Sequence, residues 1–131
     1  MKRLVVLTIL AALALFALGC GSDGKAAGAP RQVSAAEAQK KMASEKDYII
    51  LDVRTKGEYG MGHIPKAINI ANESIGSQPP AELPDKDQLI LVYCRSGKRS
   101  HDAAQKLAAM GYGNVVDFGG IMDWPGEVVQ D

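Results

Sequence analysis

Cysteine and histidine are scarce in this sequence, which limits the kinds of site it can build. Its 131 residues include two cysteines, Cys20 and Cys94, and two histidines, His63 and His101. Two thiols allow at most one disulfide. No group of His, Cys and carboxylate residues has metal-ligand spacing, so no metal is expected. The 15 basic residues are matched by 15 acidic ones, which excludes the strongly basic character typical of nucleic-acid-binding domains.

A long uncharged stretch occupies the amino terminus. Residues 4–18 follow two basic residues and carry no charge, and Gly19 and Cys20 come directly after them. A basic start, an apolar stretch that is short for a membrane span, and a small residue before the cysteine are typical of a secretory signal peptide. The ending resembles a bacterial lipobox, although Ala17 stands where leucine is more usual. We therefore expect residues 1–19 to be cleaved and Cys20 to be lipidated, with an uncleaved membrane anchor as the alternative.

The expected processing places the protein outside the cytoplasm, anchored by lipid to a bacterial membrane on the periplasmic side or at the cell surface. Residues 20–30 would be the lipidated cysteine and a flexible tether, because the stretch is small, polar and rich in glycine. Residues 31–131 would then form one folded domain. Loss of two basic residues with the signal peptide leaves the mature chain slightly acidic, so no nucleic-acid partner is expected.

Apolar runs of strand type alternate with helical periodicity from residue 31 onward. Strands are expected at residues 32–33, 48–53, 67–70, 88–93 and 114–118, and helices at residues 34–45, 55–59 and 100–110. Strands separated by helices predict a single α/β domain, a parallel sheet with helices on both faces. Ligand sites of such sheets lie beyond the carboxyl ends of the strands.

Cys94 follows the expected strand at residues 88–93 and opens a loop that carries three cations and Gly97. Nearby cations and a helix amino terminus both stabilise a thiolate, which is the nucleophilic form of cysteine. The loop N–H groups around Gly97 would form a concave anion nest. We therefore predict that the pKa of Cys94 lies below about 8.5, the value of a free cysteine. The alternative is that Cys94 is a small buried apolar residue without a chemical role.

Four stretches resemble, in order and spacing, the signatures of single-domain rhodaneses. They are LDVR at residues 51–54, the stretch at 58–70, YCRSGKRS at 93–100 and GGIMDW at 119–124. The resemblance covers residues 31–131 and implies the rhodanese-like fold with a parallel five-stranded sheet. It also implies a thiosulfate-type sulfurtransferase that carries sulfane sulfur as a persulfide on Cys94. The donor would be thiosulfate or a similar small molecule, the acceptor cyanide or a thiol, and neither a metal nor an organic cofactor would take part.

The resemblance also assigns roles to single residues, with Cys94 as the nucleophile. The remaining loop residues are expected to bind the substrate: Arg95, Ser96, Gly97, Lys98, Arg99 and Ser100. Arg99 is the cation most expected to contact the donor, and Arg95 the one most expected to point away. For Ser100 two roles stay open, a hydrogen bond to the persulfide or an N-cap for its helix.

Three polar residues outside the loop are expected to support the site rather than to react. Asp52 and Arg54 would tie the end of the sheet to the loop, and His63 would make hydrogen bonds within a turn. Lys66 stands where the family commonly has glycine, so a positive φ there would strain the lysine.

The loop from Cys94 to Arg99 is six residues long, whereas related phosphatases of the same fold have a loop one residue longer, with room for phosphate or arsenate. This length favours sulfur chemistry and leaves a phosphatase or arsenate reductase as the lesser alternative. A second alternative is a carrier that delivers sulfur to a partner and turns small donors over slowly. Nothing in the sequence suggests assembly, so a monomer is expected.

Overall fold

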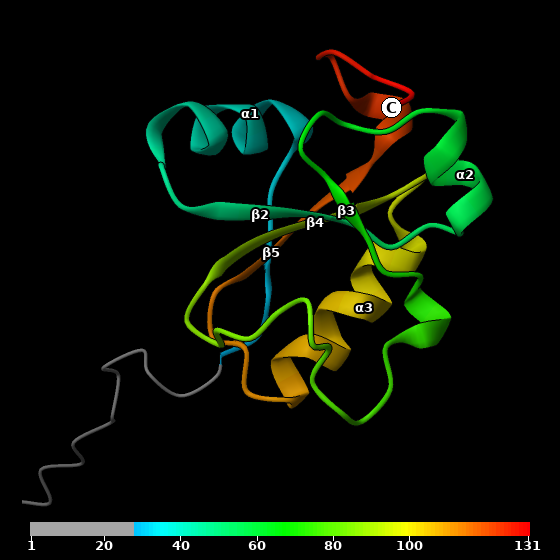
Figure 1. Ribbon diagram of the computed structural model, residues 1–131. Helices are drawn as coiled ribbons and strands as arrows, with labels where there is room; N and C mark the ends of the chain where they lie inside the picture. The colour runs from blue at the N-terminus through cyan, green and yellow to red at the C-terminus, as the bar shows by residue number, and fades with distance from the viewer. Residues whose placement is uncertain (1–27) are drawn as a thin grey trace, which may run out of the picture.

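The computed structural model describes residues 28–131 and shows one sheet with helices on both of its faces (Figure 1). The sheet has five strands in the order β1-β5-β4-β2-β3, and every neighbouring pair is parallel. The predicted α/β fold is therefore confirmed. The predictions for residues 1–19, for Cys20 and for most of the tether lie outside the described residues.

The regular elements follow the predicted order. The strands are β1 (Arg31–Gln32), β2 (Tyr48–Asp52), β3 (Ile68–Asn69), β4 (Leu89–Cys94) and β5 (Val115–Gly120). The helices are α1 (Ala35–Ser44), α2 (Lys56–Met61) and α3 (Lys98–Ala109), with short 3-10 turns η1 (Asn72–Ser74) and η2 (Ile121–Asp123). Between residues 28 and 131, no helix has the length and apolar character needed to cross a membrane.

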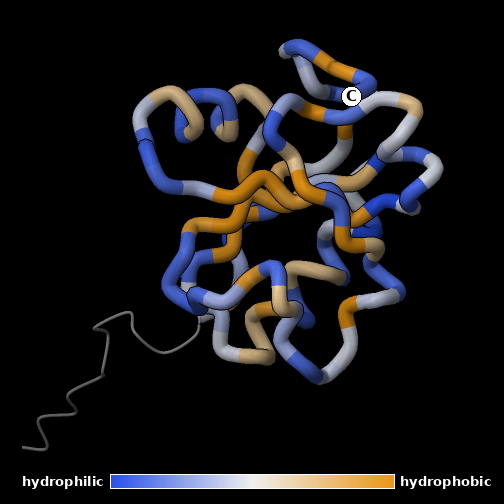
Figure 2. The backbone as a smooth tube through the Cα atoms, in the orientation of Figure 1, coloured by the Kyte–Doolittle hydropathy of each residue, from blue (hydrophilic) through white to orange (hydrophobic). Residues whose placement is uncertain are grey.

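Alternate residues of the central strands build two apolar cores, one on each face of the sheet. In β4, Ile90 and Val92 belong to the cluster that α3 covers, whereas Leu91 and Tyr93 belong to the cluster under α1. Figure 2 shows the resulting pattern, with apolar strands at the centre and hydrophilic segments around them. Burial on both faces explains why β4 reads as a continuous apolar run.

Two expectations about local structure are wrong, both near the candidate site. Helix α3 begins at Lys98 rather than at Ser100, because Gly97 adopts a left-handed conformation (φ 108°) and its carbonyl accepts from the N–H of His101. Ser100 is therefore not the N-cap. Gly119 and Gly120, expected to form a turn, are the last residues of β5.

Side chains fix the starts of the other two helices. At α1 the Ser34 hydroxyl accepts from the N–H of Glu37 at 3.1 Å and donates to the Glu37 carboxylate at 3.4 Å. At α2 the reciprocal capping box is complete, formed by Thr55 and Glu58. This box matters for the site because it orients Glu58.

Lys66 adopts the left-handed backbone conformation that its sequence position suggested, with φ 71°. The N–H of Ala67 donates to the carbonyl of Ile64 at 3.0 Å, so residues 64–67 form a β-turn with Pro65 at its second position. A positive φ at the third position is the mark of a type II turn, where glycine is preferred. Lysine there is strained by about 1 kcal/mol.

Lys66→Gly should therefore raise the free energy of unfolding, by roughly 1 kcal/mol at most, because it relieves this strain. Lys66→Ala removes the same exposed side chain and keeps the strain, so it should stay within about 0.5 kcal/mol of the parent. Urea unfolding of the three proteins measures both values. A glycine variant less stable than the alanine variant would contradict the assignment.

Candidate active site

Cys94 is the last residue of β4, so it lies at the carboxyl end of the sheet, where ligand sites of parallel sheets form. The residue is 1 % exposed and is part of the core cluster that α3 covers. The N–H of Gly97 donates to Sγ at 3.0 Å. The N–H groups of Ser96 and Ser100 and the Ser100 hydroxyl also face the sulfur closely enough to lower its pKa, so the loop and the first turn of α3 surround it with donors.

These donors decide the charge state of the thiol. Burial raises the pKa of Cys94, but the hydrogen bonds from Ser100, Gly97 and Ser96 outweigh burial, and the pKa is lowered. A lowered pKa of Cys94 is what the sequence predicts. The main cause is the ring of hydrogen-bond donors rather than the cations of the loop.

The loop rests directly on the end of β5, which leaves no room for a side chain at Gly120. A Cβ atom there would lie 2.0 Å from the carbonyl oxygen of Arg95. Two residues further on, the N–H of Met122 donates to that same oxygen at 3.3 Å. The left-handed Gly97 then turns the chain so that its N–H faces Sγ.

Asp117 is a site residue that the sequence reasoning missed. Its Oδ1 accepts from the Ser100 hydroxyl at 2.7 Å and from the N–H of Gly119 at 2.9 Å, and the residue is 4 % exposed. The Ser100 hydroxyl has one proton, and the carbonyls of Gly97 and Gly119 lie at 3.0 and 3.3 Å as competing acceptors. The sulfur of Cys94 therefore competes with Asp117 for the Ser100 hydroxyl proton, whereas the Ser100 N–H needs no such exchange. The sequence does carry a signal for this residue, because Asp117 is an acidic residue inside an otherwise apolar strand.

Arg99 is held by Glu58, a second residue that the sequence reasoning missed. Its Nη1 and Nη2 donate to the two carboxylate oxygens at 2.6 and 3.0 Å. The hydrogen bonds from Arg99 lower the pKa of Glu58 to about 2, and the same bonds raise the pKa of Arg99. The cation most expected to contact the donor is thus already paired, although its charge still lies close enough to interact with Cys94.

The structure separates the three cations of the loop. Ser96, Lys98 and Arg99 line a cavity of about 740 Å³ beside α3. Arg95 lines a different cavity of about 340 Å³, together with Arg54, Glu58 and apolar residues. The three loop cations therefore face two cavities rather than one.

Asp52 and Arg54 form a buried pair that extends to Tyr93 and supports the end of the sheet. Arg54 Nη2 donates to Asp52 Oδ2 at 2.7 Å and to the carbonyl of Gly62 at 2.6 Å, and the Tyr93 hydroxyl donates to Asp52 Oδ2 at 2.7 Å. The N–H of Ile64 donates in turn to the Tyr93 oxygen at 3.1 Å. This network joins β2, β4 and the segment after α2, in keeping with the supporting role expected for Asp52 and Arg54.

His63 is buried in the same segment, and its contacts are those of a turn residue. Its ring stacks on Tyr59 at 3.7 Å, and its Nδ1 lies 2.9 Å from the Tyr59 carbonyl. Its Nε2 is 2.6 Å from the carboxylate of Asp131, and its backbone bonds Val129 in both directions. Among residues 28–131, no group of three or more His, Cys, Asp and Glu side chains is placed to hold a metal ion.

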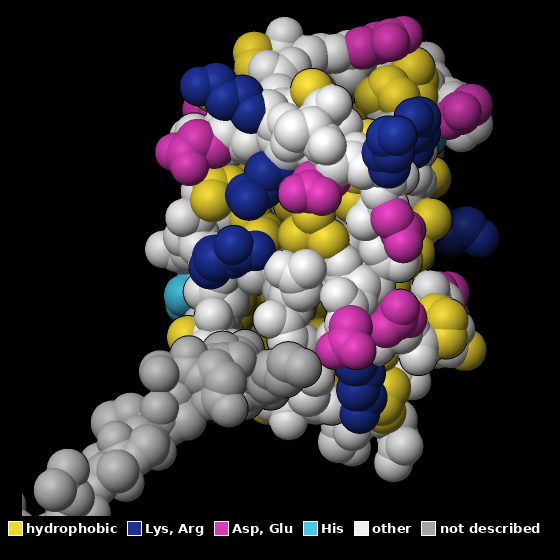
Figure 3. Space-filling view, turned by 90° about the vertical axis from the view of Figure 1, so that its left-hand side faces the viewer, with side chains coloured by type: hydrophobic (Ala, Val, Ile, Leu, Met, Phe, Trp, Pro, Cys, Tyr) yellow, Lys and Arg dark blue, Asp and Glu magenta, His cyan; other side chains and the backbone are white. Residues whose placement is uncertain are grey.

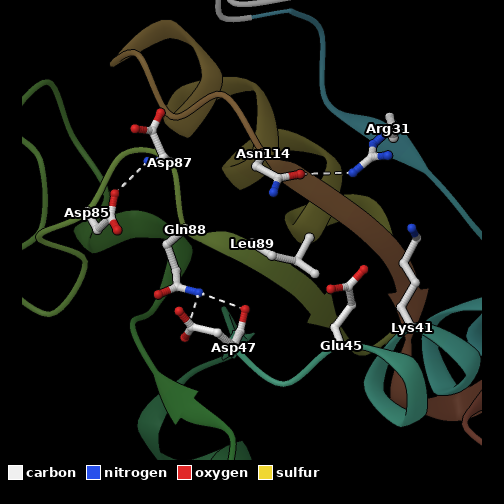
Figure 4. Close-up of a pocket in the computed structure, with 9 residues that line it drawn as sticks. All are labelled: Arg31, Lys41, Glu45, Asp47, Asp85, Asp87, Gln88, Leu89 and Asn114. Carbon is white, nitrogen blue, oxygen red and sulfur yellow. Dashed lines mark hydrogen bonds between the residues drawn. The ribbon is translucent and has the colours of Figure 1, made fainter.

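A polar cavity at the opposite end of the sheet has no link to Cys94. Figure 4 shows Asp47, Asp85 and Gln88 on one side of it and Arg31 bonded to Asn114 on another. Acidic and basic side chains are also interspersed on the face seen in Figure 3. The carboxyl end of the sheet thus remains the candidate site.

The lowered pKa of Cys94 predicts how its alkylation depends on pH. The rate constant with iodoacetamide should rise with pH and level off above an inflection lower than that of a free cysteine, because the thiolate is the reacting form. Ser96→Ala keeps the backbone N–H and should leave the inflection unchanged. An inflection at or above that of free cysteine would contradict the prediction, because burial would then outweigh the hydrogen bonds to the sulfur.

Comparison with known proteins gives a consistent result. The family model described as Rhodanese-like domain matches residues 34–127. A sulfurtransferase of Allochromatium vinosum is 34% identical over 94 residues, which is 71% of this chain and 86% of that protein. The thiosulfate sulfurtransferase PspE of Escherichia coli is 36% identical over 73 residues, 56% of this chain and 70% of that protein. A rhodanese-like domain protein of Staphylococcus aureus has a TM-score of 0.66 at 30% identity, covering 77% of this chain and 98% of that structure.

Proposed function

This chain belongs to the family of rhodanese-like domains, and on that premise we propose that it transfers sulfane sulfur through a persulfide on Cys94. The donor is thiosulfate or a similar small molecule, and the acceptor is cyanide or a thiol. The relatives named sulfurtransferases support sulfur transfer as the general chemistry. The observation that carries the proposal is the buried Sγ at the end of β4, which accepts from the N–H of Gly97 at 3.0 Å and has its pKa lowered by Ser96, Gly97 and Ser100.

In the first step the Cys94 thiolate attacks the outer sulfur of thiosulfate. A bond forms between Sγ and that sulfur, the S–S bond of thiosulfate breaks, and sulfite leaves with the bonding electron pair. The product is a Cys94 persulfide anion. The N–H groups that stabilise the thiolate are also suited to stabilise the charge of this persulfide.

In the second step the acceptor attacks the outer sulfur of the persulfide. Cyanide takes it as thiocyanate and a thiolate takes it as a new persulfide, and in either case Cys94 returns as a thiolate. No proton has to move in these steps when the attacking groups are already ionised, so a general base is unnecessary.

Thiosulfate is the preferred donor because the loop that follows Cys94 presents exposed cations to the two cavities that it lines. Lys98 and Arg95 are exposed, each lining one of the two cavities, and either one would attract a dianion. The E. coli relative named a thiosulfate sulfurtransferase supports this choice.

Thiocyanate formation from thiosulfate and cyanide tests the proposal, with an aryl phosphate as the competing substrate. We expect thiocyanate to form with turnover and no phosphate release. Phosphate release without thiocyanate would overturn the proposal. A protein that loads sulfur from thiosulfate and passes almost none to cyanide would instead be a carrier.

We further propose that the domain is an extracytoplasmic lipoprotein anchored through Cys20. Cys20→Ser should move most of the protein from the membrane fraction to the soluble fraction of a bacterial host, because lipid attachment needs the thiol. Immunoblots of the two fractions measure this, with Cys94→Ser as the matched control that should stay on the membrane. An unchanged distribution of the Cys20 variant would point to an uncleaved anchor.

A further inference from the structure

Two strongly exposed methionines lie together beside the loop that holds Cys94. In the described part of the chain the exposed large apolar residues are Met61 (78 %), Met122 (67 %) and Val128 (48 %). The first two line the cavity of about 340 Å³ that Arg95 also lines, and the half-buried Ile121 joins them. We call Met61, Ile121 and Met122 the methionine rim.

The rim is fixed in position relative to the nucleophile. Met122 lies in η2, and its N–H donates at 3.3 Å to the carbonyl of Arg95, the residue after Cys94. Met61 ends α2, and its carbonyl accepts from Gln130 Nε2 at 2.9 Å. A molecule that covers the rim is therefore held next to the cysteine loop.

One charged side chain at this cavity, that of Arg95, has no partner among residues 28–131. Arg54 is paired with Asp52, and the Glu58 carboxylate is paired with Arg99. Arg95 is exposed, and its side chain makes no hydrogen bond or ion pair with any residue between 28 and 131. The surface therefore combines an apolar rim with one available cation, which an acidic group would complement.

We propose, building on the persulfide chemistry above, that the sulfur acceptor is a protein cysteine on an apolar segment with an acidic neighbour, which docks on the methionine rim. Exposed apolar side chains gathered at one place mark interaction sites, and methionine adapts its shape to different partners. Cyanide has no apolar surface that would cover the rim. The acidic neighbour of the cysteine would pair with Arg95.

The direction of the sheet favours a protein over a lipid surface as the occupant. Residues 28–30 lead into the start of β1, which runs parallel to β5, and β5 runs parallel to β4 (Figure 1). The chain therefore enters the domain at the end of the sheet opposite Cys94. A membrane anchor that precedes residue 28 would therefore join the domain at the end opposite the rim.

Two synthetic peptides test the proposal on the sulfur-loaded protein. Each contains one cysteine and one aspartate, and the cysteine is flanked by leucines in one peptide and by serines in the other. We expect sulfur to leave Cys94 for the leucine peptide about tenfold faster at equal, subsaturating concentration, because the leucines bury apolar surface on the rim. The double variant Met61→Ser/Met122→Ser should reduce this preference to about twofold or less and leave the cyanide rate unchanged. Val128→Ser removes an exposed apolar side chain that does not line the cavity and should keep the preference.

The remaining outcomes are distinguishable. A protein that loads sulfur and serves cyanide but treats both peptides alike overturns the docking proposal alone. A double variant that loses cyanide and peptide rates equally also overturns it, because the rim would then be part of the general site. Sedimentation of Cys20→Ser protein with phosphatidylglycerol vesicles that depends on both methionines would assign the rim to a membrane instead. Failure to load sulfur at all would overturn the proposed function as well.

Discussion

Replacing Cys94 with serine should abolish thiocyanate formation, with a loss on the order of 10³-fold or more, because a hydroxyl forms no persulfide. Serine has nearly the same size, and the N–H of Gly97 that meets Sγ at 3.0 Å would meet the hydroxyl oxygen instead. The site should therefore keep its shape while losing its reaction. The assay is the colour of the iron complex of thiocyanate.

The matched control is Ser96→Ala, which changes one exposed hydroxyl of the same loop and keeps its backbone N–H. It should retain most of the activity, and urea unfolding of both variants should stay close to that of the parent. Activity that survives in Cys94→Ser would show that another group carries the sulfur.

Asp52→Ala should have the largest effect on stability, lowering the free energy of unfolding by roughly 3–5 kcal/mol. It leaves the Arg54 guanidinium buried without its partner, and Arg54 is only 6 % exposed. Burial lowers the pKa of Arg54, whereas the hydrogen bonds and charge of Asp52, and to a smaller degree Tyr93, raise it above its usual value. The Tyr93 hydroxyl would also lose the carboxylate to which it donates a hydrogen bond at 2.7 Å.

Glu82→Ala removes an exposed carboxylate and should change the free energy of unfolding by less than about 0.5 kcal/mol. Urea unfolding followed by circular dichroism measures both variants. An Asp52→Ala protein as stable as the Glu82 variant would contradict the supporting role of the buried pair.

The fold and the position of the nucleophile follow from features that are local in sequence. The apolar run before Cys94 is a central strand because both of its faces are buried, and its carboxyl end is the one place in a parallel sheet where a loop of this type opens to ligands. The strained turn at Lys66 was accessible in another way, because the resemblance to rhodaneses implies a glycine at that position.

The partners of the loop residues could not be read in the same way. Glu58 and Arg99 are 41 residues apart, and only the packing of α2 near α3 makes them a pair. Ser100 looked like an N-cap because its hydroxyl suits that role, but the left-handed Gly97 starts the helix earlier. The Ser100 hydroxyl, which does not cap the helix, instead donates a hydrogen bond to Asp117 of β5. Tertiary contacts, rather than local propensity, decide these roles.

The mass of the intact protein after incubation with thiosulfate tests the central claim most directly. We expect the protein to gain the mass of one sulfur atom, the Cys94→Ser variant to gain none, and cyanide or a thiol to restore the starting mass. A protein whose mass does not change with thiosulfate, or a sulfur atom that still appears when Cys94 is serine, would contradict it.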